Sequence, residues 1–177
     1  EVLNMNEIIQ AMKERRSCRK YQDTMIPKED LEEIIEAGLY AANGMGKQSP
    51  IIVAVTNKEV RDELSKMNAA VMGSENDPFY GAPVVLIVLA DKSVRTEVYD
   101  GSLVMGNLML ACDAKGIGSC WIHRAKEEFE SEEGKALLKK LGIEGDYEGI
   151  GHCVLGYRAD EKPVPAPRKD NRVFWCE

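Results

Sequence analysis

The sequence predicts a three-layer α-β-α domain, in which helices cover both faces of one central sheet. Segments typical of buried strands alternate along the chain with segments that carry apolar residues at helical spacing. The clearest strand candidates, 51–56 and 84–90, are almost continuously apolar and rich in β-branched residues. No internal repeat or low-complexity linker interrupts the 177 residues. We therefore expect a single domain over 1–177, with 158–177 as an extended C-terminal tail.

Two amphipathic helices are predicted near the start of the chain. The first runs from Met5 to about Arg15 or Arg16, and the second opens at Pro27, a residue suited to a first helical turn. A loop follows over 41–50, because this segment contains two glycines, an asparagine and a proline. The apolar faces have helical spacing and consist of Met5, Ile8, Ile9 and Met12 in the first helix, and Leu31, Ile34, Ile35 and Leu39 in the second.

The remaining elements follow from the same periodicities. The segment 101–115 is apolar almost all round, which predicts a central buried helix. The tail is rich in proline and begins as an extended segment. We also expect, in chain order, a helix with Val60, Leu64, Met67 and Val71 on one face, a short strand at 118–122, a surface helix at 129–141 and a last core strand at 149–157.

The composition is that of an ordinary globular protein, with 44% hydrophobic and 30% charged residues. A formal charge of −7 and a pI near 5.1 argue against broad nucleic-acid binding. No apolar run approaches the ~20 residues that span a bilayer, and no secretory signal is evident. The five cysteines are odd in number, widely spaced and without a C-x-x-C pair, which indicates neither a disulfide framework nor a zinc site. We expect a cytoplasmic protein without metal, membrane or nucleic-acid partners.

The stretch "RRSCRKY" after the first helix places four cations within six residues of an acidic protein. Cations suit the negative end of a helix dipole, and one or two would satisfy that interpretation. Four neighbouring charges repel one another, so a shared anion explains them equally well. Arg15 and Arg19 would then fork around a phosphate, and the Ser17 hydroxyl would pair with a ring amide.

The tail carries a second basic cluster, which consists of Lys162, Arg168, Lys169 and Arg172. A solvated terminus is the usual fate of such a segment. However, the chain ends in Val173, Phe174 and Trp175, apolar residues that a free tail would not need. We therefore expect the tail to dock onto the domain or onto a partner subunit, where Arg168 would reach the same anion.

Two further segments are candidates for ligand contact. In 41–50, Gly44 and Gly46 permit close approach to a flat ligand, although no dinucleotide fingerprint or P-loop pattern is present and a simple helix stop explains the loop as well. In 115–123, Trp121 is a residue type found more often in a core than as a ligand platform. His123 is a candidate acid without an evident acidic partner. A Cys-His nucleophile with Cys120 or Cys153 is possible in principle, but nothing local supports it.

The order of these motifs resembles the FMN-dependent nitroreductase family. The resemblance rests on "RRSCRKY", the loop ending in "KQSP", "NLMLACDAKGIGSCWI" and "GY…P…PRK", and it extends from about Met5 to Lys169. It implies an α+β, three-layer α/β/α nitroreductase-like fold with a largely antiparallel sheet. It also implies an intertwined homodimer with two FMN sites at the interface, and NADH or NADPH as electron donor.

The resemblance assigns a role to each matching residue. Arg15 and Arg19 would contact the flavin phosphate and ring, Ser17 the pyrimidine end, and Arg16 would add main-chain contacts or charge. Trp121, Ile122 and His123 would line one flavin face, with the His123 amide as a donor to flavin N5. Arg168 and Lys169 would complete the phosphate clamp, and the loop from Asn43 to Gln48 would reach the flavin held mainly by the other subunit.

The chain departs from the family pattern at two places, which leaves alternatives open. Gly46 stands where many members have asparagine, Ser49 precedes Pro50, and Arg124 replaces a frequent glycine. The expected activity is reduction of nitroaromatic, quinone or similar acceptors by a ping-pong hydride transfer. Flavin reduction, enone reduction, reductive dehalogenation and a non-catalytic flavin-binding module are the alternatives, and binding of an acidic protein or nucleic acid by the basic turn is a weaker one.

Overall fold

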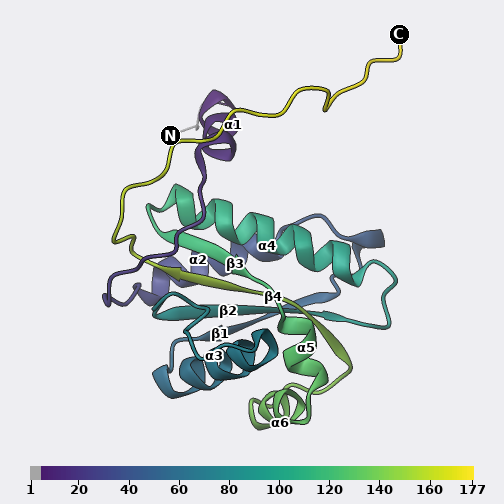
Figure 1. Cartoon of the computed structure of the whole chain (residues 1–177). Coiled ribbons are helices and arrows are strands. Elements are labelled where there is room, and N and C mark those ends of the chain that lie inside the picture. Colours follow the sequence, from purple (N-terminus) through teal and green to yellow (C-terminus); the bar gives the residue numbers. More distant parts are fainter. Residues whose placement is uncertain (1–4) are drawn as a thin grey trace.

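A computed structural model describes residues 5–177 of the chain. Its centre is one four-stranded sheet in the order β1-β2-β4-β3, and every neighbouring pair is antiparallel. The strands are β1 (Pro50–Val55), β2 (Val84–Asp91), β3 (Gly118–Ile122) and β4 (Tyr147–Gly156). The antiparallel sheet between helical layers confirms the predicted α+β, three-layer α/β/α fold (Figure 1).

Helices cover both faces of the sheet. In Figure 1, α2 (Lys28–Leu39) and α4 (Glu97–Ala114) lie on one face, and α3 (Lys58–Met72), α5 (Ala125–Glu130) and α6 (Glu132–Lys140) lie on the other. Strand β2 is buried on both faces because its side chains alternate between two cores. Val84, Leu86, Val88 and Ala90 join the core beneath α2 and α4, whereas Val85, Ile87 and Leu89 join the core beneath α3 and α5.

Two of the predicted helices differ from the structure. The surface helix expected at 129–141 is two helices, because the Ser131 side chain accepts a hydrogen bond from the Gly134 amide (3.0 Å) and starts a new helix there. Helix α4 begins at Glu97, earlier than expected, and it is not buried all round. Its sheet-facing side is buried, whereas Tyr99 is 72% exposed and Leu103 is 50% exposed.

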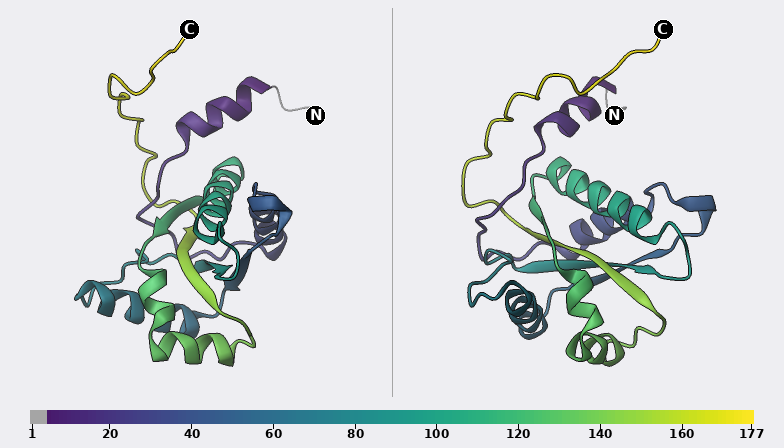
Figure 2. Two further views of the ribbon diagram at one scale, coloured as in Figure 1. Left: turned by 90° about the vertical axis from the view of Figure 1, so that its right-hand side faces the viewer. Right: turned by 45° about the vertical axis from the view of Figure 1, so that its right-hand side comes forward.

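The two ends of the chain lie together on one side of the sheet. Figure 2 shows the yellow tail standing away from the layered body, and α1 (Met5–Glu14) lies outside the layers and contacts α4. The start of the tail is fixed, because Lys162 pairs with Asp113 (2.7 Å) and the Ala159 amide donates to the Lys20 carbonyl (2.9 Å). Beyond this point the tail is exposed, so it does not dock onto its own domain. Within residues 5–177, no helix is long and apolar enough to cross a membrane.

Candidate functional site

The basic segment after α1 runs along the free edge of β3. Ser17 and Ser119 form a parallel bridge, and the Cys18 amide donates to the Ser119 carbonyl (2.8 Å). The contact depends on a glycine, because a Cβ at Gly118 would lie 2.8 Å from the Cys18 Sγ. The sheet edge therefore fixes the backbone of the segment beside the residues of β3.

Neighbouring arginines of this segment have different surroundings. The Arg16 guanidinium donates to the carbonyls of Arg15 and Lys13, the latter at 2.7 Å, and so caps the last turn of α1. The helix-end interpretation is thus right for Arg16. Arg15 turns inward instead, and its Nη1 is buried without a hydrogen-bond partner among residues 5–177. A buried charged donor without an acceptor is costly, which indicates that a ligand acceptor belongs there.

The other two residues of the predicted cluster meet Arg15 around Cys120 on β3. Burial raises the pKa of the Cys120 thiol, although Arg19, a hydrogen bond with Ser17, and Arg15 all act to lower it. The net result is a raised pKa, so Cys120 is a protonated thiol near neutral pH. Arg15, Ser17 and Arg19 thus all act on the thiol of one residue of β3.

Neither cysteine considered for a Cys-His nucleophile is activated. The thiol of Cys153 is fully buried, and its pKa is raised well above the usual value by a hydrogen bond with Cys112 and by burial. A raised pKa removes the thiolate that a nucleophile requires. The possibility of a hydrolytic pair therefore has no support.

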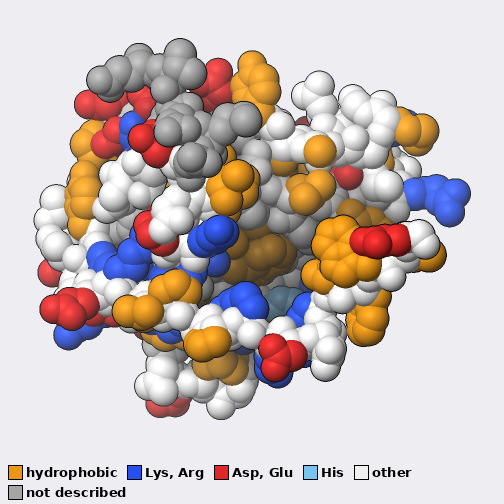
Figure 3. All heavy atoms as spheres, turned by 90° about the horizontal axis from the view of Figure 1, so that it is seen from above, with side chains coloured by type: hydrophobic (Ala, Val, Ile, Leu, Met, Phe, Trp, Pro, Cys, Tyr) orange, Lys and Arg blue, Asp and Glu red, His pale blue; other side chains and the backbone are white. Residues whose placement is uncertain are grey.

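A cavity of about 390 Å³ opens at the end of β3, a volume that suits a small planar ligand. Its walls include Arg19 from the basic segment and the strand residues that the sequence singles out. On the face seen in Figure 3, Lys and Arg side chains and a histidine surround a hollow with a hydrophobic floor. The residues that line the cavity are Arg19, Met72, Asn76, Asp77, Pro78, Tyr80, Cys120, Trp121, Ile122, His123 and Arg124.

The three predicted strand residues contribute to the cavity in different ways. Trp121 is half-buried and packs against the core on the α4 side, where a Cβ at Gly151 would lie 2.4 Å from its Nε1. Ile122 is buried in the opposite core, and His123 is exposed. Trp121 is thus partly a core residue, as its residue type indicates. His123 is the most accessible of the three residues.

The corner after β3 contains an unusual backbone conformation. Arg124 has a φ of 76°, in the left-handed region that favours glycine. The fully buried Asn68 of α3 holds this corner, because its Oδ1 accepts from the Arg124 Nε (2.9 Å) and its Nδ2 donates to the His123 carbonyl (2.8 Å). The loop that presents His123 to the cavity is therefore tied to α3.

Behind Asn68 lies a buried polar pair that the sequence analysis missed. The Asn68 Nδ2 also donates to the Glu128 Oε2 (2.7 Å), and the same oxygen is 2.6 Å from the Nε2 of His152. The side chains of Glu128 and His152 are completely buried. Asn68, Glu128 and His152 come from three elements far apart in sequence, so no local pattern could have revealed them.

The loop 43–48 lies at the other end of α4 from the basic segment, and none of its residues lines the cavity. Asn43 uses its side-chain oxygen within the loop, where it accepts from the Gln48 amide (2.9 Å). Gln48 is exposed and has a left-handed φ of 49°. A second determinant that sequence reasoning missed is the buried Asp100 of α4, which accepts from the Gly44 amide (2.9 Å) and from the Ser49 hydroxyl (2.8 Å).

The predicted tail residues are not part of this site within one chain. Arg168 and Lys169 are exposed, and the Arg168 Nη2 donates to the nearby Ala166 carbonyl (2.6 Å). Since the tail leaves the body, the clamp between Arg15 and Arg168 does not form inside a single subunit (Figures 1 and 2). Only contact across two subunits could bring these residues together.

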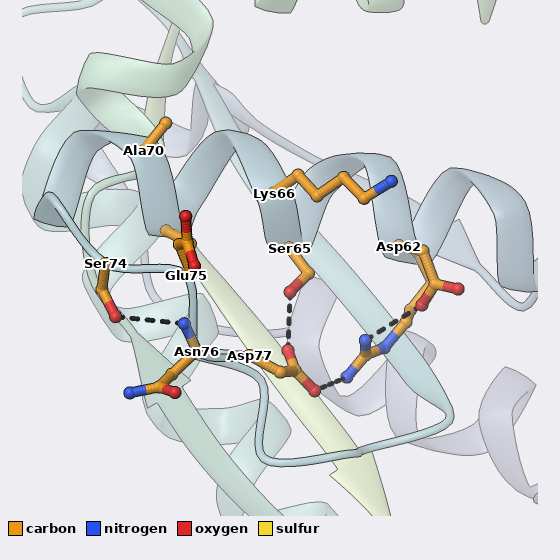
Figure 4. Close-up of a pocket in the computed structure, with 10 residues that line it drawn as sticks. Asp62, Ser65, Lys66, Ala70, Ser74, Glu75, Asn76 and Asp77 are labelled. Carbon is orange, nitrogen blue, oxygen red and sulfur yellow. Dashed lines mark hydrogen bonds and ion pairs between the residues drawn. The ribbon is translucent and has the colours of Figure 1, made fainter.

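A larger hollow, about 540 Å³, lies along α3, and Asp77 at its wall is held by neighbouring side chains (Figure 4). Asp77 accepts from the Ser65 hydroxyl (2.6 Å) and pairs with Arg61 (2.5 Å). Burial alone would raise the pKa of Asp77, yet hydrogen bonds from Arg61, Ser65 and two backbone amides outweigh burial and lower it. This cluster fixes the loop after α3, and we assign it a structural role.

Comparisons with known proteins identify the family of this chain. The model of the nitroreductase family matches residues 12–78 and 68–157. A protein of Archaeoglobus fulgidus, provisionally named an NADH dehydrogenase/NAD(P)H nitroreductase, is 32% identical over 163 residues, which cover 89% of each chain. The FMN reductase [NAD(P)H] of Bacillus subtilis is 26% identical over 88% of this chain and 68% of its own length.

Solved structures indicate the same family. The nitroreductase of Bacteroides fragilis, solved with bound FMN, has a TM-score of 0.89 and 29% identity, over 98% of this chain and all of that chain. The sheet, the basic segment along its edge and the cavity at the end of β3 thus occur in a chain whose sequence and fold match one group of proteins. The protein belongs to the nitroreductase family.

Proposed function

We propose that this protein is an FMN-dependent NAD(P)H oxidoreductase that reduces nitroaromatic, quinone or similar small acceptors. Donor and acceptor would bind in turn at the same place, which is a ping-pong mechanism. The similarity to NAD(P)H-dependent flavin enzymes and to an FMN-bound nitroreductase supports the enzyme class and the cofactor. The acceptor class and the alternation are inferred from the openness of a single cavity beside the basic segment.

One observation carries the cofactor assignment. The buried Nη1 of Arg15 has no acceptor among residues 5–177, and it lies beside Ser17 and Arg19 at the edge of the sheet. A phosphate or a ring carbonyl supplies the acceptor that such a donor needs. The residues present therefore fit FMN.

Each residue of the site then has a distinct task. Arg15 and Arg19 would bind the phosphate and the ring edge, and Ser17 the pyrimidine end. Arg16 keeps its side chain at the end of α1, and its carbonyl accepts from the Arg158 Nη2 (3.1 Å), so its backbone amide is the group that would contact the ligand. Trp121, Ile122 and the backbone of His123 would line one flavin face.

The remaining predicted residues would come from a second subunit. Exposed apolar side chains on α1, α4 and the tail, among them Leu103, Phe174 and Trp175, support a homodimer. In that dimer, Arg168 and Lys169 would complete the phosphate clamp of the partner. Asn43 shapes the loop from within, and Gln48 at its exposed end would reach the partner's flavin.

The chemistry would be supplied by bound FMN, which accepts a hydride from the nicotinamide and passes electrons to the acceptor. The protein needs no side-chain nucleophile, in agreement with the raised pKa of Cys120 and Cys153. Arg19 has no ion-pair partner among the described residues, so its charge is available to stabilise negative charge at the ring edge. The Asn68 contacts hold the His123 backbone in one orientation.

The test is flavin retention by the purified protein. We expect a yellow protein after incubation with FMN and desalting, and the double variant Arg15→Ala with Arg19→Ala should lose the flavin while its circular dichroism is preserved. Lys20→Ala removes an exposed cation of the same segment and is the matched control. Equal flavin affinity in the double variant and the wild type would contradict the assignment of these arginines.

A second candidate is another flavin reaction of the same family. The similarity to a Bacillus subtilis FMN reductase favours transfer to free flavin, and enone reduction and dehalogenation belong to the same class of chemistry. Steady-state assays with nitroaromatic, quinone, enone, halogenated and free-flavin acceptors separate these reactions. A holoprotein whose flavin is not bleached by anaerobic NADH or NADPH would instead be a non-catalytic flavin-binding module.

A further inference from the structure

Arg124 places a second cation in the cavity where glycine would fit the backbone better. Its φ of 76° lies in the left-handed region, which is unfavourable for any residue other than glycine. Only the Nε is held, by the buried Asn68 Oδ1 at 2.9 Å. The two terminal amino groups have no hydrogen-bond or ion-pair partner among residues 5–177. The guanidinium thus serves the corner only through its Nε, which donates to the buried Asn68 Oδ1.

The other charges that line the cavity leave it positive. Arg19 has no ion-pair partner among the described residues, and it shares the cavity wall with Arg124. The single acidic residue in the wall, Asp77, is already occupied by Arg61, Ser65 and the amides of Phe79 and Gly81. The charge of Asp77 is therefore compensated by groups outside the cavity, whereas the charges of Arg19 and Arg124 are not compensated among residues 5–177.

Asn68 fixes where the charge of Arg124 lies. Asn68 is fully buried, and it also holds the His123 carbonyl and the Glu128 carboxylate. Asn68 therefore anchors the guanidinium through Nε, and among the described residues the terminal amino groups have no partner on α3. Arg124 directly follows the strand residues assigned to the flavin face, and it lines the same cavity as they do.

We propose that Arg124 determines charge specificity, so that the substrate site prefers aromatic molecules that carry a carboxylate or sulfonate. Met72, Pro78 and Tyr80 supply apolar wall for a ring, and Arg124 pairs with the anionic substituent. The field of Arg19 adds to this preference. The inference rests on the proposed function, because it concerns the substrate of the same site.

The test compares an anionic ligand with its neutral isostere in the FMN-loaded protein. Dissociation constants for benzoate and benzamide are measured by perturbation of the flavin spectrum and by calorimetry. Michaelis constants are measured for 4-nitrobenzoate and 4-nitrobenzamide. We expect benzoate to bind about fivefold more tightly than benzamide, as for a partly exposed ion pair, with a preference that weakens as salt increases.

Arg124→Gly removes the charge and suits the left-handed backbone, so the variant should fold. We expect the ratio of benzoate to benzamide affinity to fall to about one in this variant. Lys66→Ala removes one positive charge from the neighbouring hollow on α3 and should leave the ratio unchanged. Arg124→Lys keeps the charge without the Nε hydrogen bond to Asn68 and should retain part of the preference.

The outcomes separate the inference from the proposed function. Flavin-loaded Arg124→Gly with an unchanged affinity ratio would overturn the role of Arg124 while the flavin assignment stands. Equal loss of the preference in Lys66→Ala would also overturn it, because the effect would then be one of overall charge. A protein that binds no FMN would refute the proposed function, and calorimetry with benzoate and benzamide would still measure the preference of the cavity.

Discussion

Replacing Arg15 with methionine should change the stability of the flavin-free and the flavin-bound protein in opposite directions. Methionine keeps the aliphatic part of the side chain and removes the buried Nη1 that has no partner among residues 5–177. Leaving a buried donor unpaired costs ~1–3 kcal/mol. Because Arg15 as a whole is only half-buried, we expect a gain of about 1 kcal/mol at the lower end of that range.

The same substitution should weaken FMN binding. A hydrogen bond to a charged group contributes about 1.5–3 kcal/mol, which corresponds to a loss of roughly 10- to 150-fold in affinity. Melting temperatures with and without FMN, together with titration of the flavin-free protein, measure both effects. In a protein of this size the flavin-free variant should melt about 2–4 °C above the wild type.

Lys20→Met is the control, because Lys20 is exposed in the same segment. This variant should change neither the melting temperature of the flavin-free protein nor its affinity for FMN. A flavin-free Arg15→Met protein that melts below the wild type and binds FMN equally well would refute the reasoning. Such a result would mean that Arg15 stabilises the fold by itself and that its Nη1 does not require an acceptor from a ligand.

Three further predictions concern the surroundings of the site. Arg124→Gly should leave the free energy of unfolding in urea almost unchanged, since relief of the left-handed backbone offsets the lost hydrogen bond to Asn68. Arg124→Ala should lower it by roughly 1–2 kcal/mol, because alanine loses the hydrogen bond and keeps the backbone strain. Equal losses in the two variants would contradict this explanation. Gly118→Ala should cost about 1–3 kcal/mol and weaken FMN binding, because the new Cβ would displace Cys18 and the basic segment from β3; unchanged urea midpoints would show that the segment tolerates the displacement. The folded-state pKa of Asp77 is lowered, so its contribution to stability is present above the unfolded pKa and is lost as the pH falls through the folded value. Asp77→Asn should therefore flatten the fall in stability below about pH 5, and an unaltered acid-unfolding profile would exclude this role.

The strands could be predicted because their side chains are buried in two cores, one on each face of the sheet. An apolar, β-branched run such as 84–90 can be buried on both faces of a sheet only as a central strand, and β2 occupies that place. The division between α5 and α6 was missed because the apolar spacing continues through Ser131. The capping signal was present in the sequence, as a serine followed by two glutamates.

The site was predictable where its residues are close in sequence. Arg15, Ser17 and Arg19 fall on one side of an extended segment, and the sheet edge brings them to the strand that carries Trp121 and His123. Asn68 and the buried pair of Glu128 with His152 were not predictable, because they meet only after three distant elements pack together. The contribution of Arg168 remains a prediction, since it depends on a second subunit.

The central claim is that the basic segment and the end of β3 form a flavin site. Its most direct test is the visible absorption spectrum of the purified protein after incubation with FMN and desalting, followed by anaerobic addition of NADH or NADPH. We expect bound flavin absorption that is bleached by at least one of the two nucleotides. A protein that stays colourless after incubation with FMN would contradict the claim.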